Sequence, residues 1–96
     1  MSNPQKSPWF LYLLQCGDQS FYTGIAKNLE RRIQAHQIGK GSRYTKAHQP
    51  VQLVFYMKLS SQKQALRLEA WVKRQSRNWK KQLIKNGEKF VRQSWK

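Results

Sequence analysis

The sequence predicts a small α/β domain of the α+β type, in which a three-stranded antiparallel sheet is flanked by helices. Two short apolar runs separated by turn residues indicate a hairpin, and a later stretch alternates with the period of a strand. The remaining segments carry helix caps and apolar residues at helical spacing. With 96 residues, of which 39% are hydrophobic, the chain can bury one core. We expect one domain over residues 9–86, a flexible lead over 1–8 and a basic extension over 87–96.

The first two strands are predicted by the segment that begins at Trp9. Residues 9–16 form a nearly unbroken apolar run of strand length, which is typical of a central strand covered on both faces. Residues 17–20 have turn chemistry, and a second strand is expected over 21–25. Gly24 lies near the end of that strand, where the backbone could come close to another group.

A helix is predicted after the hairpin, over residues 29–38. Asn28 is a favourable N-cap, and Glu30 in the first turn suits the positive end of the helix dipole. Gly39 ends the helix. Residues 39–48 are polar and basic, so we expect a surface loop there, with one helical turn possible after Ser42.

The third strand follows the Gln49-Pro50 step, because apolar and polar residues alternate over 51–59. Ser60 or Ser61 can cap a second long helix over 62–77. A further helical segment is expected over 79–85, ending at Asn86-Gly87.

Charge is the strongest global signal, since 19 Lys and Arg face 4 Asp and Glu and give a formal net charge of +15. Such an imbalance favours a polyanion, and nucleic acid is the expected partner. A ribosome-associated or simply soluble basic protein is the alternative. Cys16 has no second cysteine with which to form a disulfide or a zinc site. With no signal core and no apolar run of membrane length, we expect a cytoplasmic protein without membrane contact.

Arg32 and His36 are polar residues on the apolar side of the first helix. At 100° per residue they share one arc with Leu29 and Ile33, whereas Arg31 points to solvent. An inward arginine needs an anionic partner, for which a phosphate is a natural candidate. The alternatives are an arginine whose head reaches solvent from the edge of the stripe, and a histidine bonded to a backbone carbonyl.

Glu69 lies within the apolar arc of the second long helix. A buried carboxylate must pair with a cation, bind a metal or be protonated. The other acids are placed elsewhere: Asp18 in a turn, Glu30 at a helix start and Glu88 near the C-terminus. A two-metal site is therefore not expected, whereas one Mg²⁺ held by Glu69, waters and a substrate phosphate is feasible.

Together these residues resemble a known family, the GIY-YIG nuclease domain. The resemblance is carried by the following residues, spanning roughly Trp9 to Leu83: Phe10-Leu11-Tyr12, Tyr22-Thr23-Gly24, Arg32, His36 and Glu69. The chain is similar in particular to the small stand-alone, excinuclease-subunit-C-like members. It departs from the family pattern at Phe10, which replaces a glycine. It also has no asparagine after Glu69 that aligns with the one found in many members.

The resemblance implies a catalytic set of five side chains. Tyr12 or Tyr22 would orient or deprotonate the attacking water, with Tyr12 as our preferred base. Arg32 would stabilise the charge on the reacting phosphate, and His36 would polarise Tyr22 or contact phosphate. Glu69 would hold the divalent ion, Mg²⁺ or Mn²⁺.

The function so predicted is a metal-dependent endonuclease that hydrolyses DNA phosphodiester bonds with low sequence specificity. Phosphate contacts position a nucleic acid without reading its bases. Selectivity for branched, nicked or single-stranded DNA, as in repair or recombination, is a further hypothesis, and RNA is an open alternative. We expect a monomer, with a repair-complex protein as a possible partner.

Two basic surfaces are expected to contact nucleic acid, although each could equally be a solvated face. The first lies in the 39–48 segment and comprises Lys40, Arg43, Tyr44 and Lys46. The second lies on the later helices and comprises Lys73, Arg74, Arg77, Lys80 and Lys81. The second surface would be the working one under the alternative function, a catalytically weak or inactive nucleic-acid-binding module tethered to a repair or ribosomal assembly.

Overall fold

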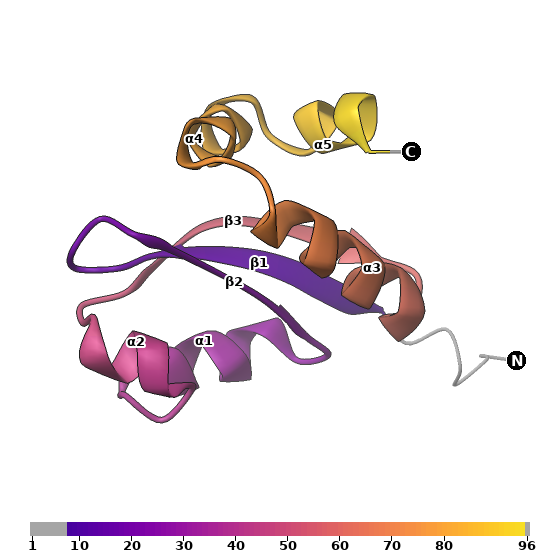
Figure 1. Ribbon diagram of the computed structural model, residues 1–96. Helices are drawn as coiled ribbons and strands as arrows, with labels where there is room; N and C mark the ends of the chain where they lie inside the picture. The colour runs from indigo at the N-terminus through magenta and orange to yellow at the C-terminus, as the bar shows by residue number, and fades with distance from the viewer. Residues whose placement is uncertain (1–7, 96) are drawn as a thin grey trace, which may run out of the picture.

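The computed structural model describes residues 8–95 as a three-stranded sheet between two layers of helices (Figure 1). The elements in chain order are β1 (Trp9–Gln15), β2 (Phe21–Ala26), α1 (Leu29–Gln37), α2 (Arg43–Ala47), β3 (Gln52–Leu59), α3 (Gln62–Lys73), α4 (Arg77–Asn86) and α5 (Glu88–Ser94). Helices α1 and α2 lie on one face of the sheet, and α3, α4 and α5 lie on the other. The predicted fold class is confirmed.

Strand β1 is central in the sheet, as its apolar sequence predicted. The strand order is β2-β1-β3, and both pairings are antiparallel. Leu11, Leu13 and Leu14 are fully buried because helices cover both faces of this strand. Tyr12 lies opposite Gly24 on β2 and opposite Tyr56 on β3.

The first two helices begin at side-chain caps. Asn28 Oδ1 accepts a hydrogen bond from the Arg31 backbone N–H at 3.1 Å, which confirms the predicted cap of α1. Ser42 caps α2 in the same way by accepting from the Thr45 N–H. The segment expected as a loop with one helical turn therefore contains a short helix.

The helix predicted over residues 62–77 is too long. Helix α3 begins after the Ser61 cap, as expected, but it ends at Lys73. Ser76 then starts a new helix, because its Oγ accepts from the Trp79 N–H at 3.0 Å. Arg77 consequently belongs to α4 rather than to the preceding helix.

The larger core lies between the sheet and α3–α5. Its buried members are all apolar: Leu11, Leu13, Phe55, Met57, Leu59, Ala65, Leu68, Val72, Leu83 and Val91. Val91 comes from α5, in the segment that we expected to be only a basic extension. Helix α5 packs on the domain because its apolar side buries Val91 in this core. Phe90 and Trp95 are partly buried against the same core.

A smaller core lies on the α1 side of the sheet. Its buried members are Tyr12, Leu14, Cys16, Ala26, Ile33 and Val51. Across residues 8–95, no helix has the length and apolar character that a bilayer crossing requires. The flexible lead predicted over residues 1–8 lies, except for Pro8, outside the residues that the structure describes.

Candidate active site

The hydroxyl group of Tyr12 lies at the centre of the predicted catalytic set. Tyr12 projects from β1 toward α1, and its side chain is 1% exposed. A Cβ atom added to Gly24 would come within 2.4 Å of the Tyr12 hydroxyl oxygen. The close approach expected at Gly24 is therefore made by the Tyr12 ring, and only glycine leaves room for it.

His36 on α1 is fully buried and joins Tyr12 to α2. Its Nε2 lies 2.7 Å from the Tyr12 hydroxyl, and its Nδ1 lies 2.8 Å from Thr45 Oγ1. A Cβ on Gly41 would lie 2.2 Å from the same Nδ1. The sequence did not identify Thr45 or Gly41; the only available signal was the Ser42 cap, which places Thr45 in the first turn of α2.

His36 and Tyr12 are both held in their neutral forms. Burial, aided by the positive charge of Arg32, lowers the pKa of His36 from 6.5 to about 4. Burial likewise raises the pKa of Tyr12, although the nearby Arg32 guanidinium acts in the opposite direction. A neutral imidazole has one donor and one acceptor, so His36 can accept from Tyr12 while it donates to Thr45.

The other predicted members surround this pair. Arg32 lies close enough to Tyr12 to lower its pKa, whereas the nearby Tyr22 and Glu69 act to raise it. The rings of Tyr22 and His36 have centroids 5.2 Å apart. The structure thus brings together all five side chains that were predicted from separate parts of the sequence.

Arg32 differs from the prediction in one respect. It was placed on the inward arc of α1, but its side chain is exposed. The residue lies at the edge of the buried stripe, so its long side chain passes beside Tyr12 and keeps its charged head in water. Arg31 is also exposed, as expected.

Glu69 forms an ion pair and still reaches solvent. Its Oε2 lies 3.3 Å from Lys73 Nζ, and the two side chains are 18% and 55% exposed respectively. No group of three or more His, Cys, Asp or Glu side chains that could hold a metal occurs within residues 8–95. One partly exposed carboxylate fits Mg²⁺, which commonly binds one or two carboxylates and keeps several waters. The exposed Lys73 can move away from such an ion.

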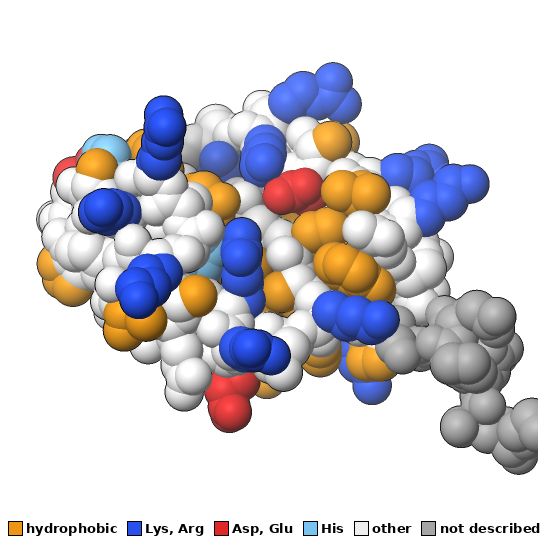
Figure 2. Space-filling view, turned by 90° about the horizontal axis from the view of Figure 1, so that it is seen from below, with side chains coloured by type: hydrophobic (Ala, Val, Ile, Leu, Met, Phe, Trp, Pro, Cys, Tyr) orange, Lys and Arg blue, Asp and Glu red, His pale blue; other side chains and the backbone are white. Residues whose placement is uncertain are grey.

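The two predicted nucleic-acid surfaces lie on different layers of the fold. Lys40, Arg43 and Lys46 are exposed near α2, on the face that Figure 2 shows to be rich in Lys and Arg side chains. The second set lies on α3 and α4, across the sheet (Figure 1): Lys73, Arg74, Arg77 and Lys81 are exposed, whereas Lys80 is partly buried. Burial lowers the pKa of Lys80.

The turn between β1 and β2 is the place where these two layers meet. From α2, the Tyr44 hydroxyl donates to Ser20 Oγ. From α4, Arg77 donates to the Gln19 carbonyl and lies over the Phe21 ring, 5.1 Å from its centroid. Side chains of both surfaces therefore hold the same turn.

Tyr44, which was predicted to contact nucleic acid, has its ring largely covered by neighbouring aromatic side chains. Its ring is stacked on Tyr22 on one side, with centroids 6.0 Å apart, and on His48 at 4.1 Å. The residue is 39% exposed, so mainly its edge is left to contact a ligand.

Residues 8–82 match the model of the GIY-YIG catalytic domain. The chain belongs to the GIY-YIG family. This is a family of nucleases, which are hydrolases that act on nucleic acid. A UPF0213 protein of Clostridium perfringens is 43% identical over 78% of this chain and 81% of its own length. The UPF0213 protein YhbQ of Escherichia coli is 39% identical over 88% of this chain and 85% of its own length.

The solution NMR structure of the UPF0213 protein BH0048 from Bacillus halodurans has a similar fold. It matches with a TM-score of 0.54 and 37% identity, covering 92% of this chain and 96% of that one. This GIY-YIG chain is thus similar over most of its length to small single-domain proteins, as the sequence predicted. The names of these relatives state no specific activity.

Proposed function

We propose that this protein is a metal-dependent endonuclease that hydrolyses DNA phosphodiester bonds with low sequence specificity. The observation that supports the proposal is the hydrogen-bonded Tyr12–His36 pair, with Tyr22, Arg32 and Glu69 nearby. A nuclease needs a proton acceptor for water and positive charge beside the phosphate. This cluster supplies both at the edge of a strongly basic surface.

Tyr12 and His36 can move a proton away from the attacking water without forming a free phenolate. In the tautomer with the proton on Nδ1, His36 donates to Thr45 Oγ1, and its Nε2 accepts from the Tyr12 hydroxyl. As water approaches the phosphorus, one of its protons passes to the Tyr12 oxygen while the Tyr12 proton passes to His36. Tyr12 stays neutral, and the positive charge comes to rest on the imidazole. The route avoids a phenolate, which burial of Tyr12 opposes. Because burial and Arg32 also oppose a positive charge on His36, the imidazolium forms only while the negative phosphate is bound beside it.

The exposed members of the cluster would contact the substrate. Arg32 would donate to the phosphate oxygens, where negative charge develops in the transition state. Tyr22, only partly buried and in contact with His36, would orient the attacking water. Glu69 would hold the Mg²⁺, which supplies Lewis-acid stabilisation of the leaving oxygen when bound.

The experiment is DNA cleavage by the purified protein with Mg²⁺ or with EDTA. Plasmid, branched and single-stranded substrates should be compared, because structure selectivity, as in repair, is part of the proposal. Arg32→Ala should lower the rate about 10³-fold, on the scale of removing one transition-state donor. Glu69→Gln should abolish the stimulation by Mg²⁺.

Two exposed residues on α1 and α3, the helices that carry Arg32 and Glu69, provide matched controls. Arg67→Ala removes an arginine from α3, and Glu30→Gln removes a carboxylate from α1, and neither lies in the cluster. Both controls should cut like the wild type. Equal cutting by all five proteins would rule out the assigned site.

A nucleic-acid-binding module is the second candidate, and the Glu69–Lys73 ion pair favours it because it already neutralises the proposed metal ligand. Under this function no substrate is cut with Mg²⁺. Binding would then fall no more with Arg32→Ala than with Lys81→Ala.

A further inference from the structure

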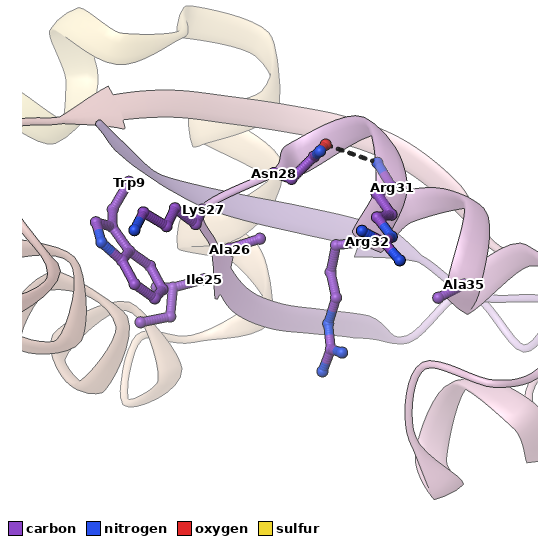
Figure 3. A pocket seen from close by; sticks show the side chains of 8 residues that line it. All are labelled: Trp9, Ile25, Ala26, Lys27, Asn28, Arg31, Arg32 and Ala35. Atoms are coloured by element: carbon purple, nitrogen blue, oxygen red, sulfur yellow. Dashed lines mark hydrogen bonds between the residues drawn. The ribbon is translucent and has the colours of Figure 1, made fainter. Parts of the chain in front are cut away.

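A groove beside the active-site cluster is lined by both cationic and aromatic side chains (Figure 3). It runs between the start of α1 and the end of β2, and its volume is about 380 Å³. This volume lies at the lower end of the range for small-molecule sites, roughly 300–1,000 Å³. The groove is therefore large enough for part of a nucleic-acid strand but not for a duplex.

The polar part of the groove has the charge expected for phosphate. Lys27, Arg31 and Arg32 line it, and none of its lining residues is acidic. The ion pairs found among residues 8–95 involve other side chains. These three exposed cations are thus free to bind an anion, and a phosphodiester provides one at each nucleotide.

The other end of the groove carries an indole ring. Trp9 is partly buried, with part of its ring packed against the main core and part lining the groove beside Ile25. Aromatic side chains beside a basic track are a common site for an unpaired base, because every base has a π face. A free phosphate or an acidic peptide would leave this end of the groove unused.

Arg32 connects the groove to the cluster, because it lines the groove and also lies beside Tyr12. A strand whose scissile phosphate contacts Arg32 must continue away from it on at least one side. The groove offers cations and an aromatic ring along that path. In Figure 3 Trp9 and Lys27 lie on one side of the groove, and Arg31 and Arg32 lie together on the other side.

We infer that this groove binds the nucleotide next to the phosphate that is cut. Lys27 and Arg31 each contact a backbone phosphate of the strand, and Trp9 stacks on the base of that nucleotide. The inference rests on the proposed function for the position of the cut. It also implies selectivity, because a base that stacks on Trp9 has left the duplex, so an unpaired nucleotide beside the cut is preferred.

The first test measures the salt dependence of binding in the Glu69→Gln background, so that binding is separated from cleavage. A fluorescent single-stranded oligonucleotide is titrated at several salt concentrations and followed by anisotropy. Lys27→Gln/Arg31→Gln should reduce the slope of log K against log salt by about 1.4, since each single-strand phosphate contact contributes about 0.7. The control Lys85→Gln/Lys89→Gln removes the same charge from exposed positions on α4 and α5 and should leave the slope unchanged.

The second test addresses the base. Trp9→Leu should weaken binding of the single strand roughly tenfold, while Trp9→Phe retains most of it, because phenylalanine keeps a stacking face. Thermal unfolding of each variant shows whether the fold is kept. A fully abasic strand of the same length should bind the wild type and Trp9→Leu equally, because it has no base to stack on the indole.

The inference is overturned if the groove double variant has the same salt slope as its control, or if the Trp9 variants all bind like the wild type. If the wild type cleaves DNA and either result is found, the groove does not bind the neighbouring nucleotide, but the proposed function still holds. If the groove variants lose binding and no protein cleaves DNA, the groove does bind a nucleotide, but the protein is not the proposed nuclease.

Discussion

The two faces of the sheet differ in the kind of interior that they bury. Between the sheet and α3–α5, ten buried apolar residues pack into one cluster. On the α1 and α2 side the apolar cluster is smaller, and a buried polar chain runs beside it from Tyr12 through His36 to Thr45. Burying polar groups costs stability unless they are hydrogen-bonded, and no unsatisfied buried side-chain atom is found in residues 8–95. The α3–α5 face therefore mainly stabilises the fold and adds Glu69 from α3 to the site, while the other face holds the buried Tyr12–His36–Thr45 chain.

The largest expected effect on stability comes from the apolar face. Leu83 on α4 is fully buried in the larger core. Leu83→Ala should lower the free energy of unfolding by about 2–5 kcal/mol, through lost burial and the cavity left behind. Urea unfolding measures this loss. DNA cleavage at a temperature where the variant is folded should stay at the wild-type rate, and a fall in cleavage there would show that the two faces are not separable.

The polar face should make stability depend on pH. His36 has a pKa of about 4 when folded and 6.5 as its ordinary value, so the unfolded chain binds the extra proton first as the pH falls. The contribution of neutral, buried His36 to the free energy of unfolding is fully present above pH 6.5 and is progressively lost as the pH falls to about 4. Between these limits the loss amounts to up to about 3 kcal/mol, because one pKa unit corresponds to about 1.4 kcal/mol.

Urea unfolding at pH 7 and at pH 4.5 measures this dependence. The chain offers a matched pair of histidines, because His48 is partly exposed whereas His36 is fully buried. His36→Gln should remove most of the pH dependence in this window, and His48→Gln should leave it in place. The same steep profile in both variants would show that another group is responsible.

A smaller loss is expected at Gly41, which covers His36. Because an added Cβ would lie 2.2 Å from His36 Nδ1, Gly41→Ala forces the backbone or the imidazole to shift. We expect a cost of about 1–3 kcal/mol, measured by thermal unfolding, together with reduced cleavage.

Gly87 provides the control for that substitution. It has φ +78, but no atom lies within 4 Å of an added Cβ. Gly87→Ala should therefore lower stability through backbone strain alone and leave cleavage unchanged. Full activity in Gly41→Ala would contradict the role of the buried chain in positioning His36.

Local signals in the sequence predicted most of the elements. The apolar run of β1 and the Asn28 and Ser61 caps act over a few residues, and all three were identified correctly. The break before α4 was predicted near residue 78, but it lies at residues 74–76, because the helical pattern of α3 was extended past Lys73. Ser76, a good N-cap, was the local signal against that continuation.

The remaining features depend on contacts between distant segments. Residues 87–96 have a basic composition, and the burial of Val91 exists only once α5 packs against the sheet and α4. Similarly, Thr45 can hold His36 only after the chain reverses at Gly39 and Gly41, and the order of residues does not specify that geometry. The five cluster residues were predicted to form one site because the family resemblance implies that they lie together. Their spacing in the sequence does not indicate this by itself.

The β1–β2 turn gives the two helical layers a mechanical connection outside the cores. Tyr44 holds it from α2 through Ser20, and Arg77 holds it from α4 through Gln19 and Phe21. Gln19 itself adopts a left-handed backbone with φ 70. These five residues thus link the two helical layers at the solvent boundary, so a strand of DNA that displaced Arg77 would loosen the turn on which Tyr44 and the aromatic stack beside His36 are held.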